Sequence, residues 1–207
     1  MNLKALSQCL MRGCFVAMAL LPIGFAGAED EERLKETALA QAKVVEAAFN
    51  ARRYDIVLAM SPKKLRDAVG SAESVEQMMA ASLGQGVVFG SVEVVGVLSI
   101  AAFEGECFVT LSKKMQVMVE DGKCLIEGGL LGISSNGGKT WEFMDISPNI
   151  RKQTEAFSKQ LMEKLVFPET RMINGDFVFI RQGDEWRPDA ATLKMMREAL
   201  NKAQKRK

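Results

Sequence analysis

The chain has 207 residues, of which 27 are Lys or Arg, 26 are Asp or Glu and none is His, so its formal net charge is +1. A charge this close to zero argues against a nucleic-acid-binding protein, which needs a strong basic excess. The lack of histidine excludes catalytic triads and metal sites that depend on this residue, and it removes the commonest general base.

The first 28 residues have the pattern of a signal peptide. Lys4 and Arg12 make the beginning basic, an unbroken apolar run follows over 15–21, and Ala26-Gly27-Ala28 supplies the small residues of a cleavage site. The apolar run is well short of the roughly 20 residues that span a bilayer. We therefore expect cleavage after Ala28 and export to the periplasm or the extracellular space.

The mature chain keeps two cysteines, Cys107 and Cys124. Cysteines in an oxidising compartment tend to pair, but these two lie on consecutive predicted strands joined by a turn at Asp121-Gly122. Cys124 then falls opposite about residue 119, far from Cys107. Because a disulfide needs Cα atoms within about 7 Å, we expect two buried free thiols or one intermolecular bond.

The N-terminal third of the mature chain is predicted to be helical. Apolar residues recur at every third or fourth position over 29–50, as on one face of a helix. Ser74 followed by Gln77 has the capping-box pattern of a helix start. The sequence predicts helices over 29–50, 54–60, 62–70 and 74–83.

From Val87 onward the hydrophobic period changes to two and β-branched residues predominate, which indicates strands. Turn residues divide this region at Glu104-Gly105-Glu106, at Asp121-Gly122 and at 135–138. Because short connections force neighbouring strands to be antiparallel, we predict a meander with one face buried against the preceding helices. The four predicted strands cover roughly 90–103, 107–119, 123–134 and 139–146.

Residues 149–207 are predicted to form a helical extension. One helix begins at Ser147-Pro148 and ends before Pro168, and Asn174-Gly175 marks a tight turn between short extended pieces. Asp189 caps a last helix. The apolar side of that helix carries Leu193, Met196 and Leu200.

The end of the chain is basic, with seven Lys or Arg and two acids from Arg187 to Lys207. Cations near the C-terminus of a helix are favourable and are usually solvated. The alternative is a weak contact with an anionic surface such as lipid head groups.

Ser134, Asn136, Gly138, Thr140 and Trp141 follow the S-x-D-x-G-x-T-W pattern called the Asp box, with Asn in the place of Asp. The box forms a β-hairpin turn in sialidases and other propellers, and propellers repeat their motif from blade to blade. The chain has one copy. We therefore predict a structural turn and not a glycosidase.

Two stretches carry a resemblance to a known family. Residues 47–60, which read AAFNARRYDIVLAM, look like the A-L-N-x-x-D-x-D-x-x-x-x-L passage between the first two helices of that family. The run from Phe108 through GKTWEF at 138–143 looks like the last strands of small exported bacterial members of unknown function. With a helical start and a long bent meander, residues 30–147 resemble the nuclear transport factor 2-like superfamily of cone-shaped α+β proteins, which includes ketosteroid isomerase.

The resemblance implies an apolar pocket between sheet and helices, and homodimers that form through the sheet. It does not extend to isomerase chemistry. Val45 stands about where a first-helix Tyr is expected, Tyr54 falls in the following linker, and the segment after Met60 lacks the expected acid. No metal site and no cofactor is predicted.

Four residues are candidates for a ligand pocket. Glu127 shares strand parity with Leu131 and Ile133, so a carboxylate on the apolar side could act as an acid or base. The alternative is that the strand begins near Glu127, where its side chain still reaches water. Glu93 poses the same question. Trp141 and Phe143 are expected to fill the core before they hold a ligand.

The sequence therefore predicts a signal peptide at 1–28, a cone-shaped α+β domain at 29–148 with a bent antiparallel sheet of about four strands, and a helical extension at 149–207. We expect an exported, non-catalytic binding or interaction module, dimeric, with a small apolar ligand or a protein partner. The alternative is a carboxylate-dependent hydrolase or isomerase that uses Glu127.

Overall fold

The computed structural model describes residues 28–83, 88–119, 122–146, 159–182 and 185–204. These residues form helices and one seven-stranded antiparallel sheet with the strand order β1-β2-β3-β5-β6-β7, while β4 pairs with β3 off this path. The predicted signal peptide, apart from Ala28, lies outside the described residues. The elements are α2 (Ala28–Asn50), α3 (Tyr54–Ala59), α4 (Lys63–Val69), α5 (Ala72–Leu83), β1 (Val88–Phe103), β2 (Glu106–Val119), β3 (Gly122–Ser134), β4 (Glu142–Asp145), α7 (Lys159–Lys164), β5 (Arg171–Asn174), β6 (Phe177–Gln182), β7 (Glu185–Pro188) and α8 (Ala190–Gln204).

The four N-terminal helices lie close to their predicted positions. The helix α4 ends at Gly70, whose φ of 82° is in the left-handed region that glycine adopts at low cost. The predicted capping box is wrong, because α5 begins at Ala72 and not after Ser74. The Oγ atom of Ser71 accepts a hydrogen bond of 3.2 Å from the Ser74 backbone N–H, so Ser71 caps the helix.

The predicted meander is present as β1, β2 and β3, which are paired antiparallel. Cys107 lies opposite Ser134 and Cys124 lies opposite Val117, so the two cysteines are at opposite ends of the β2–β3 ladder. The ten positions from Cys124 to Ser134 span about 33 Å at ~3.3 Å per residue. Both thiols are buried and form no disulfide with each other, as expected.

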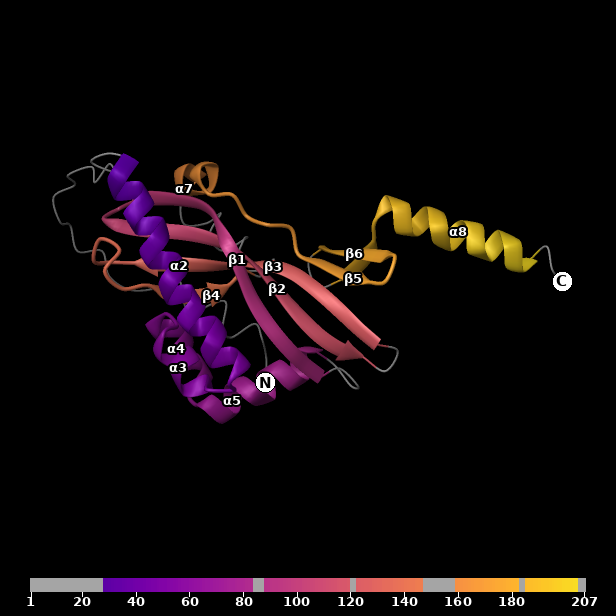
Figure 1. The fold of residues 1–207 in the computed structure, drawn as a ribbon, viewed down its shortest axis with the longest axis horizontal. Helices are drawn as coiled ribbons and strands as arrows, with labels where there is room; N and C mark the ends of the chain where they lie inside the picture. The colour runs from indigo at the N-terminus through magenta and orange to yellow at the C-terminus, as the bar shows by residue number, and fades with distance from the viewer. Residues whose placement is uncertain (1–27, 84–87, 120–121, 147–158, 183–184, 205–207) are drawn as a thin grey trace.

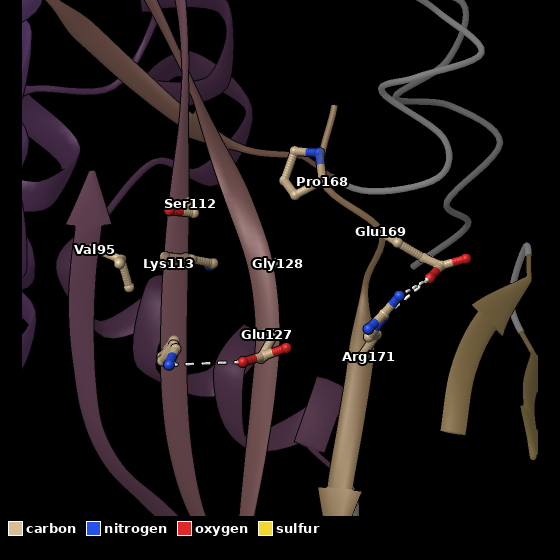
Figure 2. Close-up of a pocket in the computed structure, with 9 residues that line it drawn as sticks. Val95, Ser112, Lys113, Glu127, Gly128, Pro168, Glu169 and Arg171 are labelled. Atoms are coloured by element: carbon tan, nitrogen blue, oxygen red, sulfur yellow. Dashed lines mark hydrogen bonds and ion pairs between the residues drawn. The ribbon is translucent and has the colours of Figure 1, made fainter. Parts of the chain in front are cut away.

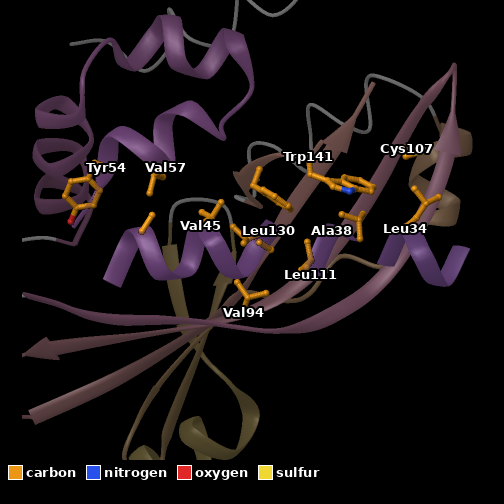
Figure 3. Packing of buried hydrophobic residues seen from close by; sticks show 14 residues of the cluster. Leu34, Ala38, Val45, Tyr54, Val57, Val94, Cys107, Leu111, Leu130 and Trp141 are labelled. Carbon is orange, nitrogen blue, oxygen red and sulfur yellow. The ribbon is translucent and has the colours of Figure 1, made fainter. Parts of the chain in front are cut away.

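The main core lies between α2 and one face of the sheet (Figure 3). From α2 it contains the residues at every third or fourth position that the sequence pattern predicts, and from β2 it contains alternate residues. Side chains fill this space, where the resemblance implied a pocket. Its buried residues are Leu34, Ala38, Ala42, Val45, Ala48, Tyr54, Val57, Val94, Cys107, Val109, Leu111, Leu130, Trp141 and Phe143.

The Asp-box segment forms the predicted structural turn. The Oγ atom of Ser134 accepts a hydrogen bond of 2.9 Å from the Gly138 N–H, and Oδ1 of Asn136 accepts one of 3.0 Å from the Thr140 N–H. The Trp141 backbone N–H donates to Oε1 of Gln41 on α2 at 2.9 Å. The turn therefore joins the end of β3 to α2 and contributes Trp141 to the core.

The prediction of about four strands with a helical C-terminal extension is wrong. The extension contains three further strands, and β5 adds them to the same sheet through the pairs Leu125–Ile173, Ile126–Met172 and Glu127–Arg171. The length of β3 makes this possible. On the edge of β3 that faces away from β2, residues 130–133 pair with β4, so residues 125–127 of the same edge are available to pair with β5. The predicted turn at Asn174-Gly175 does join two extended pieces, β5 and β6.

A second core covers the other face of the sheet at one end only. There Leu161 of α7 and Leu165 pack against Ala101, Phe108, Leu131 and Ile146. Most of the helix predicted from Ser147-Pro148 lies outside the described residues, and α7 is the part that is described. After α7 the chain passes over Gly129, where an added Cβ would lie 2.5 Å from Cγ of Pro168.

The last helix begins at its predicted cap. Oδ1 of Asp189 accepts a hydrogen bond of 2.7 Å from the Thr192 N–H. The buried Thr192 hydroxyl accepts from the Val178 N–H at 2.8 Å and donates to the Val178 carbonyl oxygen at 3.2 Å, which fixes α8 to β6. From there α8 projects away from the body of the protein (Figure 1). Among the described residues, no helix is long and apolar enough to cross a membrane.

Candidate functional site

A row of alternating charges crosses the sheet on the face that α7 packs against, in the part that α7 does not cover. Glu93 on β1 lies opposite Lys114 on β2, which lies opposite Glu127 on β3, which lies opposite Arg171 on β5. Residues directly opposite each other in an antiparallel ladder project from the same face. The Nζ atom of Lys114 is 3.7 Å from Oε1 of Glu127. Both acidic candidates therefore lie in one cross-strand row of charges.

This row borders a shallow groove of about 230 Å³ (Figure 2). The groove lies where the chain leaves Pro168 and approaches β5. It is lined by Val95, Ser112, Lys113, Lys114, Glu127, Gly128, Pro168, Glu169 and Arg171. The side chain of Glu127 is 32% exposed. The carboxylate reaches water because α7 ends short of this part of the sheet, and not because the strand begins there.

Each cation of the groove has an acidic partner. Lys114 pairs with Glu127, Arg171 pairs with Glu169 at 2.9 Å, and Lys113 pairs with Asp145. No group of three or more His, Cys, Asp or Glu among the described residues could hold a metal ion. Ion pairs of this exposed kind contribute about 0–1 kcal/mol each. The groove is thus a set of compensated charges with weak attraction for a charged ligand.

The two aromatic candidates lie away from this groove. Trp141 is 2% exposed and Phe143 is 3% exposed, and both belong to the core under α2. Phe143 also fixes this core to α3, because its N–H donates to the Met60 carbonyl oxygen at 2.7 Å. The structure therefore brings Glu93 and Glu127 together on one face and places Trp141 and Phe143 in the core on the other.

A second surface was not among the four pocket candidates. On β6 and α8, apolar side chains lie exposed around a concave space of about 580 Å³ that is lined by Phe177, Met195, Met196, Ala199 and Leu200. Their neighbour Leu193 is exposed as well. We refer to these six residues as the arm surface. The exposed fractions are 42% for Phe177, 41% for Leu193, 37% for Met195, 42% for Met196 and 60% for Leu200.

Basic residues flank the arm surface on both sides of α8. At about 100° per residue, Arg197 lies about 40° around the helix from Leu193, and Lys202 lies about 20° from Met195 on the other flank. The described part of α8 holds one acid, Glu198. The sequence showed the apolar stripe and the basic run, but it gave no sign that the body of the protein leaves the stripe uncovered.

Comparison of the chain with protein-family models, with curated proteins and with solved structures gives no match in any of the three. The resemblance to the nuclear transport factor 2-like superfamily therefore stays a prediction. The charged groove and the arm surface are therefore the features of this protein that bear on its function.

Proposed function

We propose that the protein is an exported, non-catalytic interaction module that docks to its partner through the arm surface. The observation that carries the proposal is the run of apolar side chains, 37–60% exposed, along a helix that projects from the body. Soluble proteins rarely expose large contiguous apolar patches without an interaction that covers them. Export is supported by the basic start, the apolar run and Ala26-Gly27-Ala28.

The rest of the fold favours a role as a scaffold that holds the arm surface in place. The core under α2 is filled, and the charged groove holds paired side chains. The start of α8 is fixed by Asp189 and by the two hydrogen bonds between Thr192 and Val178. A helix held in place before it binds loses less conformational entropy on docking.

A photoreactive amino acid in place of Met196 tests the proposal in the cells that make the protein. The matched control has the same amino acid in place of Met78, a 49% exposed methionine on α5. After irradiation, we expect an adduct with a protein or with lipid at position 196 and none at position 78. Equal labelling at the two positions, or none at either, would refute docking through the arm surface.

A further inference from the structure

The arm surface combines two features in one helix. Apolar residues occupy one side of α8 over Leu193, Met196 and Leu200, and cations lie on both borders of that side. Long Lys and Arg side chains in such border positions can keep their charge in water while their methylene groups cover apolar surface. This arrangement is the one that places a helix at the boundary between lipid head groups and acyl chains.

The length and composition of α8 favour lying on a bilayer over crossing it. The helix has 15 residues, which correspond to about 22 Å at ~1.5 Å per residue. No described helix is apolar enough to span a membrane. The helix α8 is therefore suited to lie along the boundary between head groups and acyl chains and not to cross the bilayer.

A second copy of the chain is a poor occupant of the same surface. Two facing copies of α8 would bring Arg197 and Lys202, which border the apolar side, toward their equivalents, with one acid per helix, Glu198, to offset them. The arm surface also contains six residues, whereas a stable interface uses about 20–30 residues on each side. The positive charge of α8 and the small size of the arm surface therefore both favour an extended, fluid anionic surface over a second copy of the chain.

We infer that the partner of the arm surface is a bilayer rich in anionic lipid, on which α8 lies with its apolar side toward the acyl chains. This inference rests on the proposed function and names its partner. Seven Lys or Arg against two acids from Arg187 to Lys207 supply the matching charge. Beyond Thr192, where α8 is fixed to β6, the helix projects from the body and can approach a flat surface (Figure 1).

Fluorescence with brominated lipid tests this directly on protein purified from its own compartment. Met196→Trp places a reporter on the apolar side of α8, and Asn201→Trp places the matched reporter on the polar side without removing a charge. Trp141 and Trp186 give the same background in both variants. Vesicles are made with phosphatidylglycerol and phosphatidylcholine in equal parts, or with phosphatidylcholine alone, and carry bromine on the acyl chains.

With phosphatidylglycerol present, we expect a blue shift and strong quenching for Met196→Trp and little change for Asn201→Trp. Neutral vesicles should give at least tenfold weaker binding. Replacing Arg197 or Lys202 by Gln should weaken binding to anionic vesicles about fivefold for each charge. Raising the salt from about 0.1 to 1 M should weaken it further, since the screening length falls from about 10 to 3 Å.

Two results would overturn the inference. The first is an unquenched Met196→Trp on anionic vesicles, and the second is equal quenching on neutral and anionic vesicles. If the photoreactive group at position 196 still forms a discrete protein adduct in either case, the proposed function stands with a protein partner. If it forms no adduct, both proposals fail.

Discussion

The side-chain amide of Asn50 pairs with the backbone of Val92 in the manner of a neighbouring strand. Nδ2 of Asn50 donates to the Val92 carbonyl oxygen, the Val92 N–H donates to Oδ1 of Asn50, and both distances are 2.8 Å. Two positions along, the Val94 N–H donates to Oε2 of Glu46 at 2.5 Å. Because β1 is at the edge of the sheet, these contacts from α2 satisfy groups that could otherwise recruit a strand from another chain.

Asn50→Ala should lower the free energy of unfolding by about 1–3 kcal/mol, since it removes both hydrogen bonds. It should also increase aggregation on storage, because the edge of β1 is then open. Urea denaturation and light scattering measure the two effects. Asn201→Ala, the same change on the exposed side of α8, is the control, and an equal loss in both variants would contradict the role of Asn50.

Gly138→Ala should destabilise the protein more than Gly137→Ala. Both glycines have positive φ, 81° and 69°, so each alanine incurs backbone strain of about 1–2 kcal/mol. A Cβ on Gly138 would also overlap Cδ2 of Leu34 in the core, whereas nothing lies within 4 Å of one on Gly137. Overpacking adds about 1–3 kcal/mol. Equal thermal midpoints for the two variants would show that the turn does not pack on α2 as described.

Glu106→Gln should raise stability at neutral pH. Burial of the Glu106 carboxyl, followed by the negative charges of Glu104 and Glu142, raises its pKa. The folded state then binds this proton more tightly than the unfolded state, so stability falls as the pH rises from the ordinary glutamate value through the raised one. The gain in the variant should therefore shrink as the pH is lowered.

Urea titrations between about pH 4 and 8 measure this difference. Glu36→Gln, on the exposed side of α2, controls for the loss of one negative charge. The gain should be small, because residue 106 is exposed overall. A gain at neutral pH that stays unchanged at acid pH would contradict the assigned cause.

After cleavage of the signal peptide, thiol counting should find both Cys107 and Cys124 free. Burial raises the pKa of the Cys107 thiol, so little of the reactive thiolate is present. Alkylation followed by mass spectrometry should label the native protein slowly and add two groups in denaturant without reductant. A chain whose mass or mobility changes on reduction would contain the intermolecular disulfide instead.

The sequence was sufficient to predict those helices and strands whose positions depend on residues close to one another in the chain. The meander follows from alternating β-branched residues and from turn glycines such as Gly105, whose φ is 84°. The end of α4 at Gly70 and the start of α8 at Asp189 follow from residues whose capping role is local. Ser71 was missed because Ser74 with Gln77 matches the capping box better by residue type alone.

The joining of β5 to β3 was not predictable in the same way. The pairs from Leu125–Ile173 to Glu127–Arg171 connect segments more than 40 positions apart, and no periodicity within a segment records its partner. The exposure of Leu200 was unpredictable for a similar reason. An apolar stripe on a helix usually predicts burial, and the sequence does not show which part of the helix lies beyond the body of the protein. The run Phe177-Val178-Phe179-Ile180 after the turn at Asn174-Gly175 was the available sign of a further hairpin.

Among the residues that the structure describes, none beyond Phe143 belongs to the buried core under α2. Substitutions in the arm, from β5 through α8, therefore leave the packing of that core intact, and the two parts of the gene can change at different rates. Selection for a new partner can therefore act on the arm without requiring compensating changes in the core under α2.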